Sequence, residues 1–99
     1  EEGVPLAAID EIRALQCLPH HENVLYLHEV FAKSEGKVSL VMDFCDTDLA
    51  TLINRSKRED ADYIDMPLPE VKKYLHMMLS GLATCHSHDL LHRDLKPGN

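Results

Sequence analysis

The stretch that decides the fold of this 99-residue chain is His92-Arg93-Asp94-Leu95-Lys96-Pro97-Gly98-Asn99. It follows the pattern H-R-D-L-x-x-x-N, which leaves three positions open. With ~1 chance in 20 for each fixed letter, a chance match somewhere in such a chain has odds of roughly 1 in 30,000. A solvated charged tail is the alternative interpretation, and the specific order of residue types argues against it. The stretch therefore indicates a functional site.

The residue types in this stretch suit the transfer of a phosphoryl group to a hydroxyl. That reaction needs a carboxylate that orients the nucleophile and accepts its proton, and a ligand for a metal ion that neutralises the phosphates. Asp94 can take the first role and Asn99 the second. Lys96 can reach the transferring phosphate as a point charge. Phosphoryl transfer is therefore the first hypothesis.

Composition is that of an ordinary globular domain, 44% hydrophobic and 27% charged, with room for one small core. The net charge of -7 argues against a nucleic-acid or anionic-membrane partner, and no apolar run is long enough to span a bilayer. No signal-peptide pattern opens the chain. Three widely spaced cysteines favour reduced thiols, and the seven histidines lack the spacing of a zinc site. Because the chain begins without methionine, we expect it to be part of a longer protein.

The first part of the chain predicts a helix followed by a hairpin. Pro5 suits a first helical turn and Pro19 stops the helix, which is expected over residues 5–18. Two apolar runs, 24–32 and 37–44, flank the turn at 34–36 and predict an antiparallel hairpin. Residues 38–42 are almost continuously apolar, as in a strand that is buried on both faces.

The second part of the chain predicts a connector and two further helices. Thr47 or Asp48 can cap a short helix at about 48–57, and the charged residues 55–66 form a surface loop. The longest helix is expected at about 69–88. Its apolar stripe consists of Val71, Tyr74, Leu75, Met78, Leu79, Leu82 and Ala83.

Two details of this second part concern packing and pairing. Gly81 weakens the long helix by about 1 kcal/mol relative to alanine, and close packing is a reason for a small residue there. Leu90-Leu91 is expected to form a short strand that leads into the final stretch.

The order of these elements resembles the middle of a eukaryotic protein kinase, over essentially all 99 residues. The resemblance implies an α+β fold, a partial protein-kinase fold with the helices called αC, αD and αE, one hairpin, the hinge and the start of the catalytic loop. Residues 1–43 would belong to the small lobe, 44–48 to the hinge and 49–99 to the large lobe.

Three stretches are similar to the cyclin-dependent kinase family in particular. Residues 5–11 resemble its PSTAIRE helix, and residues 46–49 and 85–88 are also typical of the family. Cell-cycle and kinase-activating members both look similar, so the subgroup stays open. The positions that match PSTAIRE are Pro5, Ala8, Ile9 and Glu11.

The resemblance implies a site for ATP and Mg2+. Met42 would be the gatekeeper behind the adenine, and the backbones of Asp43 and Cys45 would hydrogen-bond it. Asp48 would approach the ribose, and Gly98 would also belong to the nucleotide site. Asn99 would be a magnesium ligand.

Further roles follow from the same resemblance. Glu11 would pair with the phosphate-binding lysine of a preceding strand, and would thus serve catalysis together with Asp94, Lys96 and Asn99. Ile9 would be buried against a cyclin, and Arg93 would face a phosphorylated activation loop. The spine that joins the lobes would consist of Leu15, Leu27 and His92.

The chain departs from the family pattern in two ways. The Gly-rich loop, the lysine strand, the D-F-G motif and the A-P-E segment would all lie outside residues 1–99. Family members also usually carry arginine where this chain has Asp10.

The hypothesis is therefore a fragment of a cyclin-dependent-type serine/threonine kinase. Its partners would be a cyclin or cyclin-like subunit at residues 5–11 and protein substrates, in the nucleus or cytoplasm. The alternative is a truncated or pseudokinase product that binds a partner without catalysis.

Overall fold

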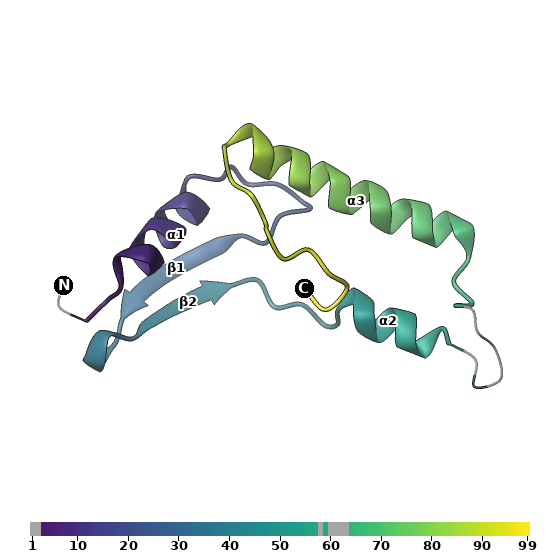
Figure 1. Cartoon of the computed structure of the whole chain (residues 1–99), viewed down its shortest axis with the longest axis horizontal. Coiled ribbons are helices and arrows are strands. Elements are labelled where there is room, and N and C mark those ends of the chain that lie inside the picture. Colours follow the sequence, from purple (N-terminus) through teal and green to yellow (C-terminus); the bar gives the residue numbers. More distant parts are fainter. Residues whose placement is uncertain (1–2, 58, 60–63) are drawn as a thin grey trace.

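The computed structural model describes residues 3–57, 59 and 64–99, which form an α+β arrangement of three α-helices and one two-stranded sheet (Figure 1). Part of the predicted surface loop, residues 58 and 60–63, lies outside this description. The elements in chain order are α1 (Leu6–Gln16), β1 (Leu27–Ala32), the short 3-10 turn η1 (Ser34–Gly36), β2 (Val38–Met42), α2 (Leu49–Arg55) and α3 (Leu68–Ser87).

Helix α1 ends two residues before the predicted boundary. The carbonyl of Pro5 accepts the N–H groups of Ala8 and Ile9, which starts the helix as the proline predicted. At the other end, the N–H of Leu18 bonds the carbonyl of Leu15, so the last turn tightens from α to 3-10 geometry. Pro19 then disfavours a helical conformation of the residue before it.

The predicted hairpin is present, and a bulge interrupts its ladder. Leu27 pairs with Met42, whereas Glu29 pairs with Val41, so His28 is an extra residue on β1. The prediction placed the start of this strand at residue 24, three residues too early, because residues 24–26 pair with no described strand. Gly36 in the turn has φ 70, and a Cβ there would lie 2.1 Å from the carbonyl oxygen of Gly3.

The two later helices lie close to their predicted positions. Asp48, not Thr47, caps α2, because its side chain accepts the N–H of Thr51 at 2.7 Å. Helix α3 begins and ends one residue before the predicted bounds. Its Gly81 packs against the loop before β1, where a Cβ would lie 2.5 Å from the carbonyl oxygen of Asn23. Close packing at Gly81 is therefore confirmed.

The expected strand at Leu90-Leu91 is wrong, because neither residue pairs with another described segment. The chain leaves α3 by a tight reversal instead, in which the N–H of Leu90 bonds the carbonyl of Cys85 and Asp89 has φ 59. From there it runs back across the molecule as irregular backbone (Figure 1). A strand requires a neighbour for its ladder, and this segment has none.

The expected small core and the two-sided burial of β2 are also wrong. No hydrophobic side chain of the described residues is fully buried, and Leu40 and Val41 of β2 are 43% and 40% exposed. The radius of gyration is 17.0 Å, against about 13 Å for a compact domain of this length. The cause is geometric, because α1 lies along the hairpin while α3 diverges from it (Figure 1). Among the described helices, none combines the length and the apolar character needed to cross a bilayer.

Candidate functional site

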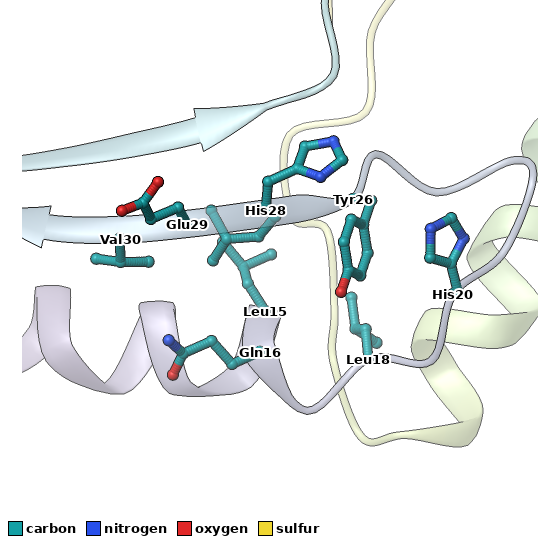
Figure 2. A pocket seen from close by; sticks show the side chains of 9 residues that line it. Leu15, Gln16, Leu18, His20, Tyr26, His28, Glu29 and Val30 are labelled. Carbon is teal, nitrogen blue, oxygen red and sulfur yellow. The ribbon is translucent and has the colours of Figure 1, made fainter.

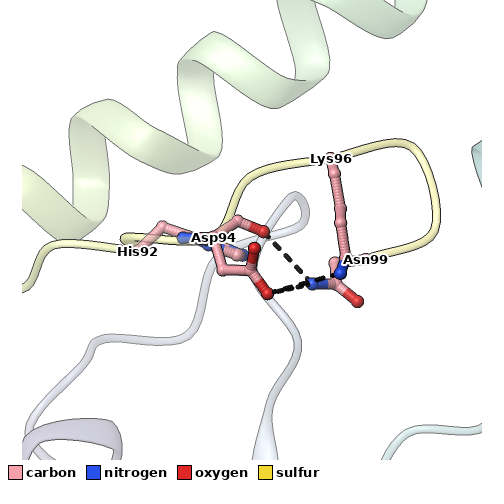
Figure 3. Close-up of polar contacts among 4 residues, drawn as sticks. All are labelled: His92, Asp94, Lys96 and Asn99. Atoms are coloured by element: carbon pink, nitrogen blue, oxygen red, sulfur yellow. Dashed lines mark hydrogen bonds and ion pairs between the residues drawn. The ribbon is translucent and has the colours of Figure 1, made fainter.

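The side chains of Asp94 and Asn99 are in direct contact at the end of the chain (Figure 3). The Asn99 amide nitrogen donates to both the main-chain oxygen and Oδ2 of Asp94, each at 3.1 Å. The N–H of Asn99 also bonds the carbonyl of Lys96 at 2.9 Å, which closes a turn between them. Although four residues separate Asp94 from Asn99, these contacts bring the two residues together in one cluster.

Lys96 adds a positive charge to this cluster. Its Nζ lies 3.6 Å from Oδ2 of Asp94, and the side chains of Asp94 and Lys96 are 70% and 58% exposed. At that exposure the pair contributes little to stability. Its position matters more, because an accessible carboxylate beside an ammonium group can receive a hydroxyl and a phosphate together.

The backbone just before the cluster adopts a left-handed conformation that its residue types do not predict. Arg93 has φ 68, in the left-handed region that few non-glycine residues enter. The N–H of Asp94 donates to Nδ1 of His92 at 3.2 Å, which closes this reversal locally. Such strained residues cluster at functional sites. The left-handed turn directs Asp94 back toward Asn99.

A main-chain hydrogen bond ties this loop to the start of α2. The N–H of Ala50 donates to the carbonyl of Pro97 at 2.9 Å, and Gly98 follows directly. The same helix start carries Asp48, whose pKa is lowered by the hydrogen bond from the Thr51 N–H. The structure therefore brings Asp48 and Gly98, two of the predicted nucleotide residues, to the same region.

The connector, residues 43–48, links β2 to α2 and is exposed throughout. Met42, the predicted gatekeeper, is half-buried and pairs across the sheet with Leu27. Cys45 is a free, exposed thiol. Asp43 accepts a hydrogen bond from His28, which is the main cause of the lowered pKa of its carboxyl. Sequence reasoning missed His28, since only the bulge in the register directs it to Asp43.

The predicted residues of α1 lie apart from the Asp94 cluster. Asp10 and Glu11 are exposed and Ile9 is half-buried. Glu11 lines a groove between α1 and β2, together with Val38 and Leu40. No contact joins Glu11 to Asp94 among the described residues.

Two of the three predicted spine residues share a second groove. Leu15 and Leu27 line a groove of about 430 Å³ between α1 and β1 (Figure 2). His92 is not among its lining residues and is exposed. Within the described part of the chain, no group of three His, Cys, Asp or Glu side chains could hold a metal ion.

Comparison with known proteins gives two findings. The model of the family described as "Protein kinase domain" matches residues 2–99. The chain is also 39% identical over all 99 residues to the protein named Cyclin-dependent kinase 20 from Pongo abelii, of which it covers 27%. The chain therefore spans about a quarter of the length of this relative, and the predicted resemblance to cyclin-dependent kinases is confirmed.

Proposed function

The chain belongs to the protein kinase domain family, and from that premise we propose that it is part of a serine/threonine kinase of the cyclin-dependent type. The reaction would transfer the γ-phosphoryl group of ATP to a serine or threonine hydroxyl of a protein. The observation that carries this proposal is the contact between Asp94 and Asn99.

We assign to Asp94 the role of orienting the acceptor hydroxyl. Asn99 holds Oδ2 of this carboxylate at 3.1 Å, and the side chain remains 70% exposed. A held but accessible carboxylate can orient the incoming hydroxyl and accept its proton. Lys96 lies beside the same oxygen and places its charge where the transferred phosphate would pass. Most of the rate enhancement then comes from positioning and charge neutralisation.

Asn99 is assigned to a magnesium ion. Its amide nitrogen is directed to Asp94, which turns the amide oxygen to the other side, and oxygen is the donor that Mg2+ prefers. The residue therefore fits the metal, which would neutralise phosphate charge when bound.

We assign to the connector the role of binding the nucleotide base. The exposed backbone at Asp43 and Cys45 would hydrogen-bond the adenine in front of Met42, with Asp48 near the ribose and Gly98 beside it. The hydrogen bond from Ala50 to Pro97 would hold these two sides of the nucleotide site together.

Residues 5–11 are assigned to a cyclin or cyclin-like partner, with Ile9 in the interface, and Glu11 to the phosphate-binding lysine. A nuclear or cytoplasmic location suits such a kinase. The non-catalytic alternative is not favoured, since Asp94, Lys96 and Asn99 are all present.

The test uses the full-length protein with its partner subunit, magnesium, labelled ATP and a protein substrate. Asp94→Asn and Asp94→Ala should lower turnover by on the order of 10²–10⁴-fold, because the base is lost. ATP affinity should stay nearly unchanged, because this carboxylate serves the hydroxyl.

Asp89→Asn is the matched control for this test. It makes the same chemical change at an exposed position with φ 59, which asparagine tolerates, and turnover should remain near wild type. Equal turnover of wild type and Asp94→Asn would refute the assignment. A parallel loss of ATP affinity would show that Asp94 serves the nucleotide instead.

A further inference from the structure

His28 is the extra residue of the bulge in β1, and its ring reaches the connector. Ladder pairs flank it on both sides, Leu27 with Met42 and Glu29 with Val41. A bulge redirects the side chain of its extra residue. Here Nε2 of His28 donates to Oδ1 of Asp43, the first residue after β2. The bulge therefore allows a side-chain hydrogen bond between β1 and the start of the connector.

Other groups on the same segment also favour the charged form of the Asp43 carboxyl. Its pKa is lowered first by the hydrogen bond from His28, and the backbone of Tyr26 and the nearby His20 act in the same direction. The rings of His20 and Tyr26 stack with centroids 4.2 Å apart, and Tyr26 meets His28 edge to face at 4.9 Å. Figure 2 shows the three rings following one another along the loop and the start of β1. This row orients His28 toward Asp43.

The rest of the connector has few other attachments. All its side chains are exposed, and Phe44 is 89% exposed. Among the described residues, one side-chain hydrogen bond ties residues 43–47 to another segment, and it joins His28 to Asp43. The Asp48 cap fixes the far end of the connector to α2. The position of the backbone in between depends on how firmly Asp43 is held.

We propose that His28 is a positioning residue for nucleotide binding, which holds Asp43 and thereby keeps the connector backbone in the conformation that receives adenine. This inference rests on the proposed function and adds to it a residue outside the connector. His28 does not touch the nucleotide in this role. A simple surface ion pair is the other interpretation, and such pairs often contribute nothing measurable.

The test uses the full-length protein with its partner subunit and four variants. His28→Leu removes the donor and keeps a side chain of substantial size, and Asp43→Ala removes the acceptor. His28→Gln retains an amide N–H that can donate to Asp43. His76→Leu is the matched control, because His76 is an exposed histidine on α3 away from the connector. Each protein is measured for amide hydrogen exchange without nucleotide, and for KM of ATP and of the protein substrate.

If the inference is right, His28→Leu and Asp43→Ala raise the KM for ATP by about two- to tenfold, the range of one net hydrogen bond. The KM for the protein substrate and the unfolding midpoint stay near wild type. Amides of residues 44–47 exchange faster, His28→Gln restores both values, and His76→Leu changes neither. The double variant should be no worse than either single variant, since both break the same contact.

Three results would count against these assignments, and they can be told apart. If amide exchange of residues 44–47 is unchanged in His28→Leu, the contact between His28 and Asp43 does not constrain the connector, and the inference is overturned. Faster exchange with an unchanged KM for ATP overturns the positioning role. A wild-type protein that binds no ATP overturns the proposed function, while the exchange data still decide whether His28 holds the connector.

Discussion

Helix α3 approaches the loop before β1 so closely at Gly81 that a Cβ there would lie 2.5 Å from the carbonyl oxygen of Asn23. Gly81 is also the one described residue that is buried. Backbone meets backbone at this point, so the helix cannot adapt by moving a flexible side chain. The contact fixes α3 against the segment that leads into the sheet.

Gly81→Ala should therefore destabilise the full-length protein, although alanine favours a helix by about 1 kcal/mol over glycine. Overpacking of this kind costs typically about 1–3 kcal/mol, which exceeds the gain in helix propensity. Gly98→Ala is the matched control, because nothing lies within 4 Å of a Cβ there. Chemical denaturation of the three proteins measures the difference. A Gly81→Ala protein as stable as wild type would mean that α3 can shift away from Asn23.

Asp48→Ala should weaken α2, and the effect should depend on pH. The hydrogen bond from the Thr51 N–H lowers the pKa of Asp48 below its ordinary value of 3.8. Because the pKa of Asp48 is lower in the folded state, the charged cap stabilises the protein at pH values above the ordinary pKa. This stabilisation is lost as the pH falls through the folded-state pKa. Unfolding midpoints of wild type and variant should differ at about pH 7, and the difference should shrink as the pH falls below the ordinary value of 3.8. A difference that stays the same size above and below that value would show that the charge is irrelevant. Asp48→Asn, which caps without titrating, is the control.

Asp10→Arg should increase the activation that follows phosphorylation of the activation loop. In the cyclin-dependent kinases that the chain resembles, an arginine at this position helps to hold the phosphothreonine, whereas Asp10 would repel a phosphate of about -1.5 to -2 charges. Asp10 is exposed, and no ion pair with Arg13 neutralises it among the described residues. Kinase activity of the full-length protein with the proposed cyclin partner, phosphorylated and unphosphorylated, measures the gain. Equal gains in wild type and variant would mean that Asp10 points away from the phosphate.

Residues 1–99 produced in isolation should be inactive and should lack a cooperative thermal transition. Large apolar side chains on the long helix remain open to solvent, with Leu68 63%, Leu75 50% and Leu79 56% exposed. Among the described residues, nothing pairs with the two outer edges of the hairpin. A whole domain is stable by only about 5–15 kcal/mol, so the loss of most packing interfaces should exhaust that margin. A sharp melting transition with dispersed amide NMR signals, or phosphate transfer that Asp94→Asn abolishes, would contradict this expectation.

What could be predicted from the sequence was local in the chain. The apolar period of α3 predicted its bounds to within one residue, because helical hydrogen bonds join residues four apart. The grouping of Asp94, Lys96 and Asn99 was predictable because these residues are also close in the chain, with only four residues between the outer two.

The tertiary structure alone decided the contacts between distant segments. The register of the hairpin placed His28 beside Asp43, and the return of the final stretch brought Pro97 to Ala50. In the part of the chain that the structure describes, it also left Leu90-Leu91 without a strand partner and one face of β2 without a covering element. Periodicity states which residues prefer an apolar neighbour, but the path of the chain in space determines whether that neighbour is there.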